Sequence, residues 1–202
     1  MKAYAMTWLK PVTLNGAGVR LELLDQRHLD DLVEATQDGE LWTLWYTSVP
    51  DPEGVATEIQ RRLDLFAQQL MLPFAIIEEA SGKAVGMTTF MNVDAANRRV
   101  EIGSTWLRKS VQSTGLNTQC KLLLLTYAFE ELDCVAVEFR THFFNQQSRA
   151  GIERLGAKLD GILRSHQIAP NGTLRDTCVY SIIASEWPTV KAHLIFQATR
   201  PR

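Results

Sequence analysis

The sequence predicts a single α/β domain built on one mixed β-sheet. Segments with the apolar alternation of strands recur through the chain, segments with helical apolar spacing separate them, and 46% of the 202 residues are hydrophobic. A strand at 99–107, a helix at 116–132 and a strand at 134–141 form a crossover, which joins parallel strands. We therefore expect one domain over residues 1–202, with helices flanking a sheet that contains a parallel pair.

The first half of the chain is predicted to contain one strand, two helices and three further strands. Alternation marks the strands, and Asp51 with Pro52 marks the start of the second helix. The expected elements are a turn at 14–18, a strand at 19–24, helices at 25–37 and 51–70, and strands at 72–79, 84–93 and 99–107.

The second half is predicted to run from the crossover helix to a closing helix. Leu122, Leu125, Phe129 and Leu132 are spaced by three, four and three residues, which places them on one helical face. The Asn171-Gly172 pair is typical of a hairpin turn. The expected elements are a helix at 116–132, a strand at 134–141, a helix at 146–155, hairpin strands at 157–168 and 174–184, and a helix at 185–197 capped by Ser185.

Composition and charge exclude several classes of protein. The formal net charge of −2 lacks the basic excess of most nucleic-acid-binding proteins, so we expect no nucleic-acid partner. No run approaches the ~18 apolar residues of a membrane span, and the N-terminal segment does not resemble a signal peptide. The three cysteines are scattered and odd in number, which predicts free thiols. We expect a cytoplasmic protein with no membrane partner, and no metal site, because the histidines lack ligand spacing.

The start of the crossover helix is unusual because residues 110–120 carry no charge. A helix N-terminus holds about half a positive charge and free N–H donors, so it can bind phosphate. Gly115 would let the backbone approach such a ligand closely. The segment matches neither the nucleotide-binding P-loop nor the dinucleotide fingerprint. The alternative is an ordinary turn, with Ser113 or Thr118 as the helix cap.

Four segments in order carry a resemblance to a known family. Residues 112–117 resemble the Q/R-x-x-G-x-G/A signature of the GNAT N-acetyltransferase superfamily, with Asn117 where Gly or Ala is usual. The strand at 99–107 is similar to the family's central strand, and 145–157 is similar to its N-x-x-S segment and short helix. The final hairpin resembles the RimJ and RimL branch, whose members acetylate ribosomal-protein N-termini. The resemblance covers roughly residues 12–190.

The resemblance implies a mostly antiparallel sheet whose parallel pair splays apart at the cofactor site. It also implies acetyl-CoA as co-substrate and direct transfer to a primary amine, foremost a protein N-terminus. The alternatives are a small amine as acceptor, a CoA-binding sensor without turnover, or an interaction module without cofactor. The implied cofactor-binding residues are Trp106, Leu107, Gln112, Ser113, Thr114, Gly115, Leu116, Asn117, Thr118, Asn145 and Ser148.

Two residues are candidates for proton transfer. Glu101 interrupts an apolar strand, where a carboxylate is costly unless paired or functional, and the family often uses a Glu here to activate the amine. The alternative is a structural carboxylate. Many family members have a Tyr that acts as the general acid four residues after the Ser of the N-x-x-S segment. That position is Ile152 here. Ser148 is then the default acid. Asn145 either holds the pantetheine amide or caps the helix.

Three aromatic residues are candidates for the acceptor site. Trp42, Trp45 and Tyr46 follow the acidic Asp38 and Glu40, and an aromatic wall beside carboxylates would suit a cationic amine. The alternative is that they only pack beneath a loop. Arg175 and Asp176 are expected to form an ion pair. Homodimers are common in the family, so a homodimer remains an open alternative to a monomer.

Overall fold

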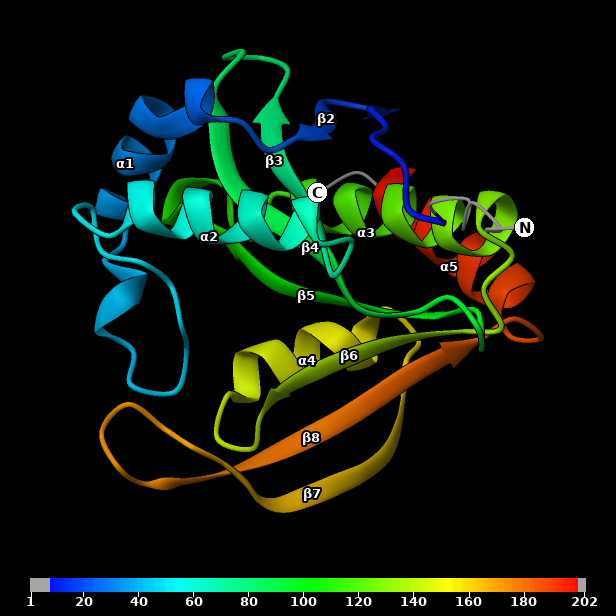
Figure 1. Ribbon diagram of the computed structural model, residues 1–202. Helices are drawn as coiled ribbons and strands as arrows, with labels where there is room; N and C mark the ends of the chain where they lie inside the picture. The colour runs from blue at the N-terminus through cyan, green and yellow to red at the C-terminus, as the bar shows by residue number, and fades with distance from the viewer. Residues whose placement is uncertain (1–7, 200–202) are drawn as a thin grey trace, which may run out of the picture.

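One eight-stranded sheet organises residues 8–199, the part of the chain described by the computed structural model (Figure 1). The strand order is β1-β2-β3-β4-β5-β6-β8-β7. The strands are β1 (Leu14–Gly16), β2 (Val19–Leu23), β3 (Leu72–Glu78), β4 (Ala84–Asp94), β5 (Arg99–Leu107), β6 (Ala136–His142), β7 (Lys158–Ile168) and β8 (Leu174–Ile183). The α/β class and the mixed sheet predicted from sequence are confirmed.

Helices lie between these strands and flank the sheet (Figure 1). The α-helices are α1 (Leu29–Gln37), α2 (Val55–Ala67), α3 (Leu116–Thr126), α4 (Gln146–Arg154) and α5 (Trp187–Thr199). The shorter helical segments are η1 (Gln26–His28), η2 (Leu41–Thr43), η3 (Lys109–Val111) and the π-helical η4 (Tyr127–Glu131), which continues α3.

Both faces of the central strands are buried, which explains why β3 is apolar almost throughout. Leu72, Phe74 and Ile76 point into the larger core, which also receives side chains of α3, α4 and α5. Ala75 and Ile77 point the other way, into a smaller core with α1 and α2. A strand covered on both faces needs apolar residues at successive positions rather than alternate ones. The two cores hold the sheet rigid beneath the site described below.

The parallel pair of the sheet separates after a short paired stretch. Strands β5 and β6 pair only through Arg99, Val100 and Glu101 of β5, although β5 continues to Leu107 and β6 to His142. Figure 1 shows the two ribbons diverging beyond this point, with α4 lying over β6. The splayed pair implied by the family resemblance is therefore confirmed.

A β-bulge redirects β5 within the splayed region. Met87 lies opposite Trp106 but Thr89 lies opposite Gly103, so Thr88 faces two residues of β5. One of them, Ser104, has a φ of 47°, which is unusual for a residue other than glycine. Such a conformation persists only when its surroundings hold it.

Two buried cations hold this bulge in place. Arg62 of α2 donates to the Ser104 carbonyl at 3.0 Å and to Thr89 Oγ1 at 2.8 Å, while Glu58 pairs with its Nε. Lys121 of α3 donates to Thr105 Oγ1 at 2.8 Å, and burial lowers the pKa of its ammonium to about 8. Both side chains are at least 95% buried. The sequence analysis did not single out either residue.

Some element boundaries differ from those predicted. Residues 14–18 were expected to be a turn, but β1 pairs with β2 as a hairpin. Helix α2 begins at Val55 rather than Asp51, because residues 51–54 form a turn in which Asp51 Oδ1 accepts from the Gly54 N–H at 2.7 Å. Helix α5 begins at Trp187, two residues after Ser185.

Cys120, Cys134 and Cys178 are free and buried, as the sequence predicted. Across residues 8–199, no helix has the length and apolar character needed to cross a bilayer.

Candidate active site

Glu101 lies at the vertex where the parallel strands separate. It is the last residue of β5 that pairs with β6, and its side chain is 5% exposed. Asn92 Nδ2 donates to Glu101 Oε2 at 2.6 Å, and Arg140 Nε lies 3.5 Å from the same oxygen. The other oxygen, Oε1, receives no hydrogen bond from residues 8–199, so it can accept a proton. The position suits a general base.

The local sequence explains both the orientation and the pKa of this carboxyl group. A Cβ atom added to Gly103 would lie 2.8 Å from Glu101 Oε1, so a glycine is needed to leave space for the carboxylate. Burial raises the pKa of Glu101 above its usual value, while the Asn92 hydrogen bond and the Arg140 charge act in the opposite direction. The net upward shift brings the group closer to the range useful for accepting protons near neutral pH.

The N-terminus of α3 lies beyond the splayed end of β5 and has no side-chain cap. Gly115 occupies the N-cap position with a φ of 102°, a conformation that favours glycine. Thr114 Oγ1 instead donates to the Val111 carbonyl at 2.7 Å, and Thr118 is buried. Gly115, rather than Ser113 or Thr118, therefore occupies the N-cap position of α3. Apart from a long 3.4 Å hydrogen bond from the Leu116 N–H to Thr114 Oγ1, no side-chain cap is seen at the N-terminus of α3, and a helix start of this kind can bind an anion.

Polar contacts connect this segment to its neighbours. Gln112 Nε2 donates to the Leu107 carbonyl at 2.9 Å, which ties the loop to the end of β5. Gln147 of α4 donates to Gln112 Oε1 at 3.5 Å. The oxygen Oδ1 of Asn117 is buried without a partner among the described residues. The structure thus brings residues 106–118 and the start of α4 together, as the family resemblance implied.

Asn145 is the N-cap of α4. Its Oδ1 accepts from the Ser148 N–H at 3.0 Å, which leaves the amide Nδ2 available for another acceptor. Ser148 is half-buried in the first turn, and Ile152 packs in the core. The capping alternative for Asn145 is confirmed, and a role of Nδ2 toward a ligand remains compatible with it.

We expect Asn145→Ala to have two separable effects. Loss of the cap should cost about 1 kcal/mol of stability, and loss of Nδ2 should raise the KM for the acetyl-CoA that the family resemblance implies more than it lowers kcat. The matched control is Asn145→Asp, which retains a capping oxygen and removes the amide donor. Melting curves and initial rates of the three proteins measure both effects. An aspartate variant with the wild-type KM would show that Asn145 serves the helix alone.

The expected acceptor residues divide into two groups. Trp45 and Tyr46 line a cavity of about 160 Å³ together with His142 at the end of β6 and Arg175 at the start of β8. The Trp45 and His142 rings meet edge to face with centroids 5.0 Å apart. Trp42 lies in η2 and does not line this cavity. The loop between α1 and α2 therefore reaches the turn of the last hairpin, as Figure 1 shows.

The charges expected beside these aromatic residues were wrong. Asp38 does not face the cavity: it accepts hydrogen bonds from Arg108 Nε at 2.8 Å and from the Ser110 N–H at 3.1 Å. Glu40 is also absent from the cavity lining. The lining holds no carboxylate, and its polar side chains include His142 and Arg175, which are hydrogen-bond donors.

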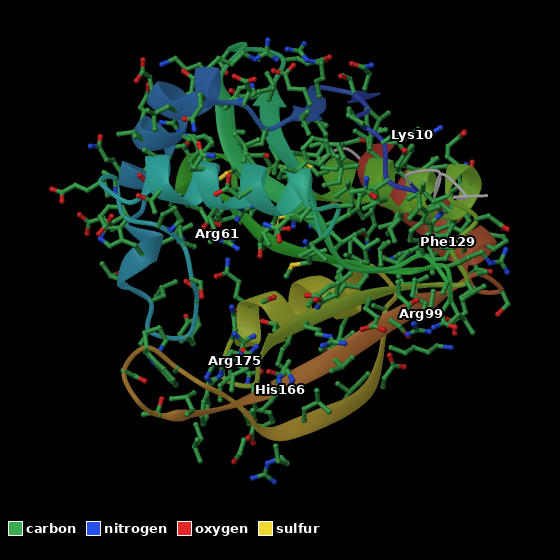
Figure 2. All side chains as sticks on the ribbon, in the orientation of Figure 1. Lys10, Arg61, Arg99, Phe129, His166 and Arg175 are labelled. Carbon is green, nitrogen blue, oxygen red and sulfur yellow. The ribbon has the colours of Figure 1, made fainter. Side chains whose placement is uncertain are left out.

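The expected ion pair between Arg175 and Asp176 was also wrong. Asp176 pairs with Arg164 at 2.6 Å and accepts from the Ser165 N–H at 2.7 Å. Arg175 faces the opposite way, toward Glu101, and burial lowers the pKa of its guanidinium. Figure 2 shows Arg175 near the open end of the splayed pair and Arg99 at the closed end. Successive residues of a strand point to opposite faces, which explains the failure.

Sequence reasoning missed several residues that shape this site. They are Asn92, Arg140, His142 and Arg175, along with Arg62 and Lys121 at the bulge. His142 could have been found from its position, because ligands of open α/β sheets bind outside the C-terminal ends of strands. Among the side chains described, no three His, Cys, Asp or Glu residues are grouped to hold a metal ion.

Known proteins resemble this chain in sequence and in structure. A family profile described as an acetyltransferase (GNAT) domain matches residues 19–158. The Bacillus subtilis (strain 168) protein "Putative ribosomal N-acetyltransferase YdaF" is 37% identical over 106 residues, 52% of this chain. The match spans only 57% of that relative's length.

Solved structures extend the likeness to nearly the whole chain. A GCN5-related N-acetyltransferase from Brucella melitensis has a TM-score of 0.83 at 32% identity, and the match covers 95% of this chain and 87% of that one. The structure of RimL, a ribosomal L7/L12 alpha-N-protein acetyltransferase, has a TM-score of 0.73 at 20% identity and covers 87% of this chain and 96% of its own. At that identity the likeness to RimL concerns the fold.

Proposed function

Because the chain belongs to the acetyltransferase (GNAT) family, we propose that it transfers an acetyl group from acetyl-CoA to a protein N-terminus of the ribosomal-protein type. The observation that carries this proposal is the splayed β5–β6 pair, with Glu101 at its vertex and the uncapped start of α3 beyond it. The likeness to the Bacillus subtilis protein named as a putative ribosomal N-acetyltransferase supports the ribosomal-protein type of acceptor.

The residues of the site fit acetyl-CoA at two positions. The N–H groups at the start of α3 and the helix dipole would hold the pyrophosphate, and the φ of Gly115 keeps a side chain out of its way. Asn145 Nδ2 and the main chain of Trp106 and Leu107 would hold the pantetheine arm. When bound, acetyl-CoA supplies an acetyl group already activated as a thioester.

Glu101 and Ser148 account for the movement of protons. An α-amine has a pKa of about 8, so much of it is protonated at neutral pH and must lose a proton before it can attack. Glu101 Oε1 takes that proton, directly or through water, because it receives no hydrogen bond from the described residues and the pKa of the carboxyl group is raised. The Ser148 hydroxyl would donate a proton to the departing thiolate and be reprotonated from water, while the proton held by Glu101 returns to solvent. Positioning of the two reactants provides much of the remaining acceleration.

The test is release of free CoA from acetyl-CoA in the presence of a panel of amines. The panel contains ribosomal-protein N-terminal peptides, the same peptides with blocked N-termini, polyamines, aminoglycosides and free amino acids. We expect rapid release only with the unblocked peptides. Faster release with a small amine than with every peptide would contradict the protein acceptor.

A thermal-shift measurement with CoA separates the alternatives without turnover. A ligand that binds only the folded protein at 100 times its Kd stabilises it by about 2.7 kcal/mol. We expect CoA to raise the melting temperature accordingly. If CoA stabilises the protein but no amine of the panel leads to release of CoA, the protein is a CoA-binding sensor. If CoA neither stabilises the protein nor is released, the cofactor assignment is contradicted.

A further inference from the structure

The cavity beside Trp45 and Tyr46 is lined by hydrogen-bond donors that lack acceptors. It opens between the loop after η2 and the turn of the β7–β8 hairpin, and it borders the splayed strands through His142 and Arg175. The atoms His142 Nε2 and Arg175 Nε are both buried without a partner in the described part of the chain. Buried polar atoms in folded proteins are nearly always paired, so two unpaired donors on residues that line one cavity point to an acceptor that enters the cavity and reaches them.

The hydrogen bond that His142 Nδ1 accepts determines the tautomer of the ring. The Phe144 N–H donates to His142 Nδ1 at 3.1 Å, so Nδ1 is an acceptor and the proton of the neutral ring is on Nε2. The side chain is 3% exposed. Burial and the charge of Arg175 lower the pKa of His142, which keeps the ring neutral at physiological pH. His142 therefore has a single ring N–H donor, at Nε2, and it belongs to the lining of the cavity.

The positive charge of Arg175 interacts with the negative charge of Glu101 but is not neutralised by a direct ion pair. Arg175 forms no ion pair within the described part of the chain. The acidic groups nearest to it are engaged elsewhere: Glu101 with Asn92 and Arg140, and Asp176 with Arg164. The residues that line the cavity include no carboxylate. A half-buried guanidinium without a partner is costly, and an anion relieves that cost better than a neutral acceptor does.

We propose that this cavity binds a carboxylate of the acceptor, located a few bonds from the amine that is acetylated. The proposal rests on the proposed function, because it places the amine beside Glu101. Arg175 is close enough to Glu101 for their charges to interact, so an anion held by Arg175 keeps the neighbouring amine at the vertex of the strands. The same chemistry has two sources, an acidic side chain at the start of a peptide or the α-carboxylate of a free amino acid.

The surrounding aromatic rings strengthen this recognition. Trp45, Tyr46 and Phe144 surround the His142 ring, with ring centroids 5.0 to 6.5 Å away. When an acceptor fills the cavity, these rings exclude water from the donors, and hydrogen bonds to a charged acceptor become stronger in such surroundings. An acceptor with an amide in place of the carboxylate would leave the guanidinium charge unpaired.

The experiment compares two peptides that differ only at the second residue, Asp in one and Asn in the other. For the wild type, we expect kcat/KM to be about 10-fold or more higher with Asp, the effect of one charge-assisted hydrogen bond. In Arg175→Gln this preference should fall to about threefold or less. Equal kcat/KM for the two peptides with the wild type, together with equal kcat/KM for free serine and serinamide, would overturn the proposal.

Arg164→Gln is the matched control for a general effect of charge. Arg164 lies on the adjacent strand, is exposed and pairs with Asp176 outside the cavity, so the preference should persist in this variant. Equal loss of preference in both variants would also overturn the proposal. If Arg175→Gln melts far below the wild type, Arg175→Lys tests the same bond, because it keeps the charge and removes the Nε donor. A wild-type preference retained in Arg175→Lys would exclude Arg175 Nε as the donor.

Two further arms distinguish the sources and separate this proposal from the proposed function. Free serine compared with serinamide tests the α-carboxylate, and a preference confined to the peptides identifies the acidic side chain. Calorimetric binding of both peptides in the presence of CoA tests the cavity without turnover. Tighter binding of the Asp peptide without acetylation would support the cavity and contradict the proposed function. Acetylation of both peptides at equal rates, with no preference for free serine over serinamide, would contradict the carboxylate site and support the proposed function.

Discussion

Glu101→Gln is expected to lower kcat by about 10²- to 10⁴-fold at neutral pH, the usual contribution of a positioned acid–base group. Glutamine keeps the shape of the side chain and an oxygen for Asn92, but it cannot take a proton from the amine. Binding of acetyl-CoA should be unchanged. The loss should shrink as the pH approaches the pKa of the acceptor amine, because solvent then deprotonates more of it. Rate profiles from pH 6 to 9 with one peptide measure this recovery.

The same variant should not lose stability at neutral pH. The pKa of Glu101 is raised in the folded state, so the folded protein holds this proton more tightly than the unfolded chain does. The wild type is therefore penalised once the pH rises through the folded-state pKa, and the glutamine variant escapes that penalty. We expect an equal or higher melting temperature for the variant above this pKa. A much lower one would identify Glu101 as a structural partner.

Glu138→Gln is a matched control on the adjacent strand. Glu138 is the register partner of Glu101, and its pKa is lowered by hydrogen bonds with Arg99 and Arg140, which outweigh the effect of burial. Its contribution to stability is therefore present at neutral pH and lost as the pH falls through the folded-state pKa. Glu138→Gln should lower the melting temperature at neutral pH and preserve the shape of the rate profile. Overlapping rate profiles for all three proteins would show that the proton leaves by another route.

Gly115→Asp is expected to weaken CoA binding by roughly 100-fold, because it places a carboxylate where the pyrophosphate would lie. The helix dipole partly offsets the backbone strain of an aspartate at a φ of 102°, since a negative charge is favourable at the start of a helix. The variant should therefore fold. Titration calorimetry with CoA at two salt concentrations measures the effect, which should shrink as salt screens the repulsion.

Gly115→Asn isolates the charge in this prediction. Asparagine has nearly the same size as aspartate and tolerates a positive φ better than most residues. We expect its CoA affinity to lie close to that of the wild type and far above that of Gly115→Asp. Equal affinity of the two variants would attribute the loss to bulk. Wild-type affinity in a folded Gly115→Asp protein would contradict the pyrophosphate assignment.

Much of the fold could be predicted because its signals are local. The strand expected at 99–107 coincides with β5, since alternation and flanking polar residues mark both ends. Gly115 was singled out from its place in a small, uncharged segment, and its φ is positive in the structure. The short strand β1 was missed because Asn15 and Gly16 are typical of turns, and only pairing with β2 makes them a strand.

The parts of the site that could not be predicted depend on contacts between distant segments. A charged helix residue such as Arg62 is expected at the surface from sequence alone. In the structure its guanidinium donates a hydrogen bond to the Ser104 carbonyl on β5. The bulge that creates this contact has no sequence signal, because a serine with positive φ is imposed by its neighbours. His142 acquires its significance only when the hairpin brings Arg175 beside it. Side-chain pairing across a sheet is a property of the assembled fold rather than of any window of sequence.

Because all three cysteines are buried, the folded protein should be nearly unreactive toward thiol reagents. Burial raises the pKa of Cys120 and Cys134 to about 12 and also raises that of Cys178, and the reactive species is the thiolate. A colorimetric disulfide reagent added to a reaction should therefore report liberated CoA with little background from the enzyme. The same thiols become reactive on unfolding. A brief alkylation pulse at each temperature, followed by mass spectrometry of the alkylated cysteines, would therefore measure the unfolded fraction of every variant discussed above.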